Sequence, residues 1–197
     1  MAARLMRFLA LGVLAAAAVG CGTTAPSRFY TLSATATSDS ARGAAYTVLV
    51  GPVSIPADVD RPQFVVQVAP NRVDIDEFNR WAAPLSDGIA RAVAADLAVV
   101  LGTPDVAAWP LANFAAAYQV TIDVQRFESI QGQAAMLDAV WTVRQTADGA
   151  TRNGRTVARE SVIDASIDAL AAAHSRALAT MSADIAVVIR AQAAAAR

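Results

Sequence analysis

The chain contains one histidine and one cysteine, which limits the chemistry that its side chains can perform. A zinc site of the usual kind needs three or four nitrogen or sulfur ligands, which these two residues do not supply. A Ser-His-Asp hydrolase would have to use His174, which stands beside Ser175 and six residues after Asp168. Adjacent residues of a helix point about 100° apart, so Ser175 cannot reach His174 as a triad nucleophile does. We therefore expect His174 to be a buried helix residue.

Other catalytic patterns are missing from the sequence. It has no G-x-S-x-G nucleophile elbow and no glycine-rich phosphate loop. A single cysteine cannot form a disulfide within the chain. Paired carboxylates leave no spacing signature, so acid–base chemistry stays open as an alternative. The sequence predicts a protein that is not an enzyme and that has no metal and no cofactor.

Cys21 has a different kind of chemistry, because it stands directly behind an apolar segment. Arg4 and Arg7 precede residues 8–19, which carry no charge. As a helix this segment reaches only about 18 Å, short of the ~30 Å hydrocarbon core, so it predicts a signal peptide and not a membrane span. The sequence Ala-Val-Gly-Cys over residues 18–21 resembles a bacterial lipobox. The alternative is ordinary signal-peptidase cleavage that leaves Cys21 as a free thiol.

Lipidation would give Cys21 a thioether-linked diacylglycerol and an N-acyl chain, which together hold a protein on a bilayer. Gly22 stands where an aspartate would favour inner-membrane retention, so we expect an outer-membrane lipoprotein that faces the periplasm. Residues 22–27 span about 20 Å when fully extended, which keeps the domain near the membrane. Residues 33–45 are small and polar and predict a mobile loop.

Length and composition indicate one domain. The 197 residues are 55% hydrophobic, enough for one core. Sixteen basic residues, all arginine, stand against seventeen acidic ones, so no strong field favours nucleic acid. We divide the chain into a lipoprotein signal peptide (1–20), a lipid-anchored tether with a short strand and a loop (21–45), and a folded domain (46–197).

Hydrophobic periodicity in the folded part alternates between two and 3.6 residues, which predicts an α+β domain. We expect a single domain with a mostly antiparallel sheet and two main helices, one after the first hairpin and one long and C-terminal. Strands are predicted at 47–55, 63–69, 73–75, 118–124, 137–143 and 156–162, helices at about 84–101 and 166–194, and turns at Asp148-Gly149 and Asn153-Gly154.

The final helix has an apolar seam with heptad spacing. Its members are Ile167, Ala171, His174, Leu178, Met181, Ile185 and Val188. We expect this helix to lie across the sheet with the seam buried. A coiled-coil contact with a partner is the alternative.

Two short stretches around the first hairpin stand out. Residues 55–66 read IPADVDRPQFVV, and residues 80–85 read RWAAPL. Their candidates for a partner contact are Asp60, Arg61, Arg80 and Trp81. The alternative is that these residues brace a turn and the start of a helix, since Pro62 holds Arg61 extended and Asp60 could pair with either arginine.

The order of these motifs resembles the ABC-type transport auxiliary lipoprotein family, the PqiC/YmbA-like lipoproteins. The matching features are the lipobox, Tyr30-Thr31-Leu32, the IPxxxDRPQ stretch, a hairpin and then RWAxPL. Ala18, Ala57 and Ala83 depart from the residues that relatives often carry there.

The resemblance implies an outer-membrane lipoprotein without catalysis. It would serve as an auxiliary subunit of an MCE-type intermembrane lipid transport system and dock the periplasmic conduit. The implied partners are an MCE-domain periplasmic protein and its inner-membrane permease, and a homo-oligomeric ring around the conduit would be a natural geometry. A stand-alone periplasmic lipid-binding or envelope-assembly lipoprotein is the alternative.

Overall fold

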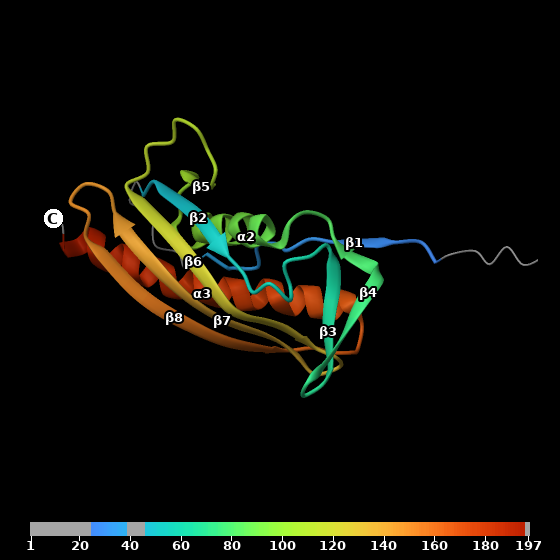
Figure 1. Ribbon diagram of the computed structural model, residues 1–197. Coiled ribbons are helices and arrows are strands. Elements are labelled where there is room, and N and C mark those ends of the chain that lie inside the picture. The colour runs from blue at the N-terminus through green and yellow to red at the C-terminus, as the bar shows by residue number, and fades with distance from the viewer. Residues whose placement is uncertain (1–24, 39–45, 196–197) are drawn as a thin grey trace, which may run out of the picture.

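The computed structural model describes residues 25–38 and 46–195, and in this part of the chain two helices cover one face of an eight-stranded sheet (Figure 1). Cys21, the predicted signal peptide and residues 39–45 lie outside the described residues. The α+β class is confirmed. The elements are β1 (Arg28–Tyr30), β2 (Val48–Ser54), β3 (Gln63–Ala69), β4 (Arg72–Trp81), α2 (Leu85–Leu101), β5 (Val106–Ala108), β6 (Tyr118–Ile130), β7 (Ala134–Gln145), β8 (Thr151–Ser161) and α3 (Ile167–Ala195).

The sheet is mixed, so the expectation of a mostly antiparallel sheet is wrong. Among the described strands, β3–β4, β6–β7 and β7–β8 pair antiparallel, whereas β1–β4, β2–β5, β2–β6 and β3–β6 pair parallel. The antiparallel pairs are sequence neighbours joined by turns. The parallel pairs join strands separated by long connections, and alternation in the sequence shows which face of a strand is buried but not its partner.

β6 is the strand around which the sheet is arranged. One of its edges pairs with β7 along its length, and the other is shared by β2 at its start and β3 at its end. Gln125 forms a β-bulge. Val124 pairs with Ala139 and Arg126 pairs with Asp138, so Gln125 has no partner on β7. The alternation changes there, so that Val124 and Phe127 are both buried. This bulge explains why the predicted strand ended at residue 124.

Both helices pack on the same face of the sheet and against each other. Helix α3 has the length and hydropathy of a membrane span, yet its seam faces β7, β8 and α2. Leu178, Met181 and Ile185 are fully buried. The prediction of a helix lying across the sheet is therefore confirmed, and the seam is occupied within the chain.

His174 lies in the middle of this core and is fully buried. Its ring stacks on Phe127 with centroids 3.8 Å apart, and its Nε2 lies 2.9 Å from the Ser129 hydroxyl. Burial lowers the pKa of His174 from 6.5 to about 3, so the ring is neutral. Ser175 donates its hydroxyl hydrogen to the Ala171 carbonyl oxygen, away from any triad geometry. His174 is thus a core residue, as its place on the seam predicts.

Residues 31–38, which we name the N-terminal strap, cross both helices. The backbone N–H groups of Thr35 and Ala36 both donate to Oδ1 of Asp96 on α2, at 2.8 Å each. The N–H of Ser33 donates to the Ser175 hydroxyl on α3 at 3.2 Å. The expectation of a mobile loop is therefore wrong for residues 33–38, because long-range hydrogen bonds hold polar residues that have no local pattern.

The Asp96 carboxylate is fully buried, and Oδ1 takes both strap hydrogen bonds while Oδ2 has no partner. Burial raises the pKa of Asp96, and the two backbone hydrogen bonds partly oppose that rise. An apolar side chain here would leave two backbone donors unpaired. Asp96 is therefore the residue that fastens the strap to α2.

Gly154 lies inside β8 and not in a turn, which corrects the prediction from Asn153-Gly154. The turn before β8 contains Gly149, with φ of +73°. Gly154 pairs with Trp141, and a Cβ atom on it would overlap the Trp141 ring. Trp141 donates its indole N–H to the Thr156 hydroxyl at 3.1 Å. The glycine thus leaves room for an aromatic ring, which a turn signal in the sequence does not reveal.

A methyl group at Gly154 should destabilise the protein. Gly154→Ala places its Cβ in the Trp141 ring, and such overpacking costs about 1–3 kcal/mol of unfolding free energy. Gly88→Ala is the matched control, because its nearest neighbour is Leu32 at an ordinary 3.7 Å and α2 favours alanine by about 0.5–1 kcal/mol. Urea unfolding of both variants should give opposite signs. Equal effects would contradict this account of Gly154.

The buried histidine should make stability depend on pH. Because the folded state lowers the pKa of His174 to about 3, only the unfolded chain binds a proton between that value and 6.5. The unfolding free energy should therefore fall by about 2 kcal/mol between pH 7 and pH 5. His174→Gln should lose this part of the pH dependence in urea titrations followed by tryptophan fluorescence. Identical slopes in both proteins would show that His174 is not buried in the neutral form.

Candidate partner-docking surface

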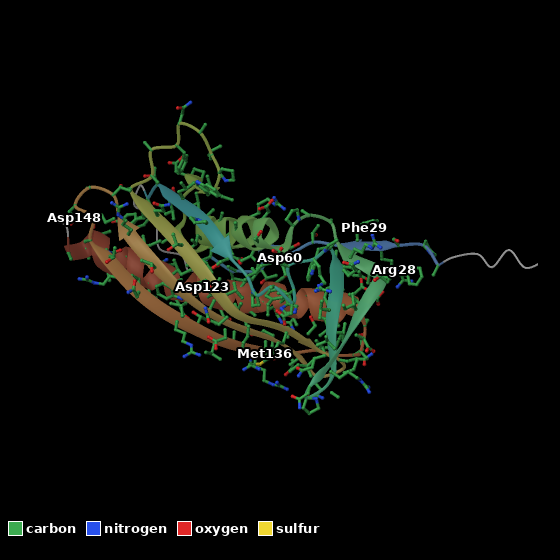
Figure 2. All side chains as sticks on the ribbon, in the orientation of Figure 1. Arg28, Phe29, Asp60, Asp123, Met136 and Asp148 are labelled. Carbon is green, nitrogen blue, oxygen red and sulfur yellow. The ribbon has the colours of Figure 1, made fainter. Side chains whose placement is uncertain are left out.

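The face of the sheet opposite the helices is left uncovered by the described elements, and it carries mostly polar side chains (Figure 2). We name it the outer face. Neighbouring positions of β6, β7 and β8 form rows across it, one of them made of Arg126, Asp138 and Val157. This alternation of buried and exposed residues is typical of an antiparallel region with one solvated side.

Two bidentate ion pairs order the outer face. Arg155 donates from Nε and Nη2 to both oxygens of Asp138, at 2.8 and 2.7 Å. This hydrogen-bonded guanidinium lowers the pKa of Asp138 although burial acts against it. Arg126 binds Glu128 in the same way at 2.9 and 2.7 Å. Bidentate ion pairs of this type hold both side chains in one geometry, so the positions of the charges on the outer face are fixed.

Apolar side chains stand between these charges. Val157 is 60% exposed and Val140 is 39% exposed, while Met136 is half-buried. A non-obligate protein interface is about as apolar as the rest of a protein surface, so this mixed polarity is compatible with one. On this face the Ser54 hydroxyl also donates to Oδ1 of Asp123 at 2.8 Å, while the one histidine of the chain is buried on the other side of the sheet.

Trp81, one of the four predicted contact residues, is mostly buried. It stacks on Phe64 with centroids 4.6 Å apart, and its ring lies edge-on to Phe127 at 6.2 Å. Its backbone N–H donates to the Pro62 carbonyl oxygen at 2.7 Å. Only 7% of the residue is exposed. The structure gives Trp81 the bracing position that the sequence left open as an alternative.

Asp60, Arg61 and Arg80 lie nearer the surface. Asp60 is exposed on a turn in which its N–H donates to the Pro56 carbonyl oxygen at 3.1 Å. Arg61 is half-buried and its Nε has no partner. Arg80 donates from Nε to the Glu77 carbonyl oxygen at 2.9 Å and lies 3.4 Å from the Glu77 carboxylate. Asp60 is thus the most accessible of the four, and the ion partner of Arg80 is Glu77.

The sequence analysis missed the residues that organise the outer face. The spacing of Arg126 and Glu128 places both on one face of a strand, so this pair was visible in the sequence as a same-face pair of opposite charge. Asp138 and Arg155 meet only through the register of β7 and β8, for which the sequence holds no signal. Among the described residues, no group of three or more histidine, cysteine, aspartate or glutamate side chains is placed to hold a metal ion.

Comparison with known proteins agrees with this fold. A crystal structure of protein XCC0632 from Xanthomonas campestris aligns with a TM-score of 0.70 at 21% identity, covering 87% of this chain and all of that one. A crystal structure of an uncharacterized protein aligns with a TM-score of 0.67 at 19% identity, covering 84% and 99%. None of the curated proteins matches the sequence.

A family model described as the ABC-type transport auxiliary lipoprotein component matches residues 30–186. The match begins at the last residue of β1 and ends within α3, so it includes the strap, strands β2 to β8, α2 and about two thirds of α3. The chain therefore belongs to the ABC-type transport auxiliary lipoprotein family.

Proposed function

We propose that the protein is an outer-membrane lipoprotein that serves as an auxiliary subunit of an MCE-type intermembrane lipid transport system. The observation that carries this proposal is the family match over residues 30–186, which makes the chain a component that assists an ABC-type transporter. Cys21 is the proposed lipid attachment point. The protein docks the periplasmic conduit, formed by an MCE-domain protein whose permease lies in the inner membrane.

The geometry supports docking over chemistry. The outer face offers ordered ion pairs and exposed Val157 to a protein partner, and Asp60 and Arg80 are accessible beyond it. The one imidazole of the chain is fully buried and stacked, so it cannot act as a general base on a substrate. A ring of copies around the conduit would repeat this surface around an axis.

A stand-alone lipid-binding lipoprotein is the second candidate. It would use the apolar groove between the strap and α2, lined by Tyr30, Leu32, Trp81, Leu85 and Ala92. The volume of this groove is about 250 Å³, below the ~300–1,000 Å³ that ligand pockets usually have. This groove has room for part of an acyl chain and not for a whole lipid.

Recovery of the transporter tests the function directly. Tagged protein pulled down from gently cross-linked membranes should bring an MCE-domain protein and its permease, identified by mass spectrometry. Cys21→Ser removes the proposed lipid and hence the confinement to the membrane, so recovery should fall about a hundredfold. If the wild type recovers no transporter component while a known envelope complex survives, the proposed function is wrong and the stand-alone binder takes its place.

Photo-crosslinking tests which surface makes the contact. A photoreactive amino acid at Asp60 or at Val157 should crosslink to the MCE-domain protein, because Val157 is exposed on the outer face and Asp60 is exposed on the turn before β3. Val187 is the matched control, since it is 62% exposed against 60% for Val157 but lies on α3. Crosslinking from Val187 alone would place the partner on the helical side and would contradict docking through the outer face.

A further inference from the structure

We infer that one end of the domain rests on the surface of the bilayer that holds Cys21, an inference that relies on the proposed lipidation. We name this surface the apolar end. Its members are Phe29, Val73, Ile75, Phe78 and Ile163, which are 66%, 50%, 44%, 42% and 96% exposed. They come from β1, β4 and the loop before α3. These residues contact the interfacial layer of a lipid membrane.

Ile75 and Phe78 share a groove with the start of α3, and the other members belong to the same strand or to adjoining segments. A cavity of about 410 Å³ is lined by Ile75 and Phe78 of β4 and by Ile167 of α3. The β3–β4 hairpin therefore lies beside the start of that helix. Ile163 stands four residues before Ile167. Phe29 pairs with Arg80 near the end of β4, and it lies where the described chain begins (Figure 2). The apolar end is thus built from segments distant in sequence.

The short tether decides which surface faces the membrane. Residues 22–27 separate Cys21 from β1, and six extended residues span about 20 Å. The chain after the tether adds no further reach, because β1 is paired with β4 and the strap is hydrogen-bonded to Asp96 and Ser175. The end of the domain that carries β1 therefore stays within about 20 Å of the bilayer.

Other exposed apolar residues lack this constraint. Trp109 and Leu111 follow β5, and β5 and β1 are at opposite ends of the strand order. Val187 lies near the C-terminal end of α3, which Figure 1 shows on the far side from β1. Val187 lies about 30 Å along α3 from its start at Ile167, which exceeds the ~20 Å reach of the tether. Within the part of the chain that the structure describes, the apolar end is the exposed hydrophobic surface that contains β1, the strand next to the tether.

The charges around the apolar end limit how deep the contact goes. Asp74 and Glu77 of β4 stand among the apolar residues, and Arg28 and Arg80 lie beside them. Carboxylates are costly to remove from water, so the body of the hairpin stays outside the hydrocarbon. The tips of the phenylalanine and isoleucine side chains reach the headgroup and upper acyl region. Because both signs of charge are present, a zwitterionic membrane is sufficient.

The experiment uses the cysteine count of the chain. Cys21 is the only cysteine, and lipidation would consume its thiol, so an introduced cysteine is the single reactive site. Full-length lipidated Ile163→Cys and Val187→Cys are labelled with a polarity-sensitive fluorophore and reconstituted into phosphatidylcholine vesicles. The vesicles carry, or lack, a lipid with a nitroxide near its headgroup. The label at position 163 should lose fluorescence to the nitroxide, and the label at position 187 should not.

Phe29→Cys serves as a second probe from another element and should also be quenched. Circular dichroism checks that each variant is folded. Equal quenching at positions 163 and 187, or none at positions 163 and 29 in protein that floats with the vesicles, would overturn the inference. If Cys21 carries no lipid, the protein instead stays in the soluble fraction and its Cys21 takes up the label, which marks failure of the proposed anchor. Loss of transporter recovery in the pull-down would leave the quenching result unchanged.

Discussion

The structure depends on one strand, β6, which serves two halves of the molecule through the bulge at Gln125. Before the bulge, β6 pairs with β2, the strand that packs against α2. After it, β6 pairs with β3, and Phe127 and Ser129 turn inward to meet His174 of α3. Without the extra residue, either the first or the second half of β6 would point its apolar side chains at solvent.

The aromatic cluster around His174 connects this core to the hairpin. Trp81 lies between Phe64 of β3 and Phe127 of β6, and the histidine ring completes the stack. A residue type that suggests catalysis therefore has a structural role, because burial removes the proton-transfer capacity of His174 near neutral pH. The same cluster explains why Trp81 contributes little accessible surface to a docking site.

The strap connects the fold to the proposed role at the membrane. Asp96 on α2 and Ser175 on α3 hold the segment that leads from β1, so the position of the anchor relative to the domain is restricted. In the proposed arrangement the lipid anchor would orient the domain as well as attach it. The apolar end would then face the bilayer, and the outer face would stay free for a protein of the transport system. Membership of the auxiliary lipoprotein family agrees with such a supporting part.

The sequence alone determined the class of the protein, the strands and helices with strong periodicity, and the buried seam of α3. It also indicated the family, because the motifs around the first hairpin are local in the chain. Tertiary structure decided the parallel pairings of β6, the bulge at Gln125, the place of Gly154 under Trp141 and the hold of Asp96 on the strap. These features join residues far apart in sequence, and local hydrophobic patterns report which side of an element is buried but not what it meets.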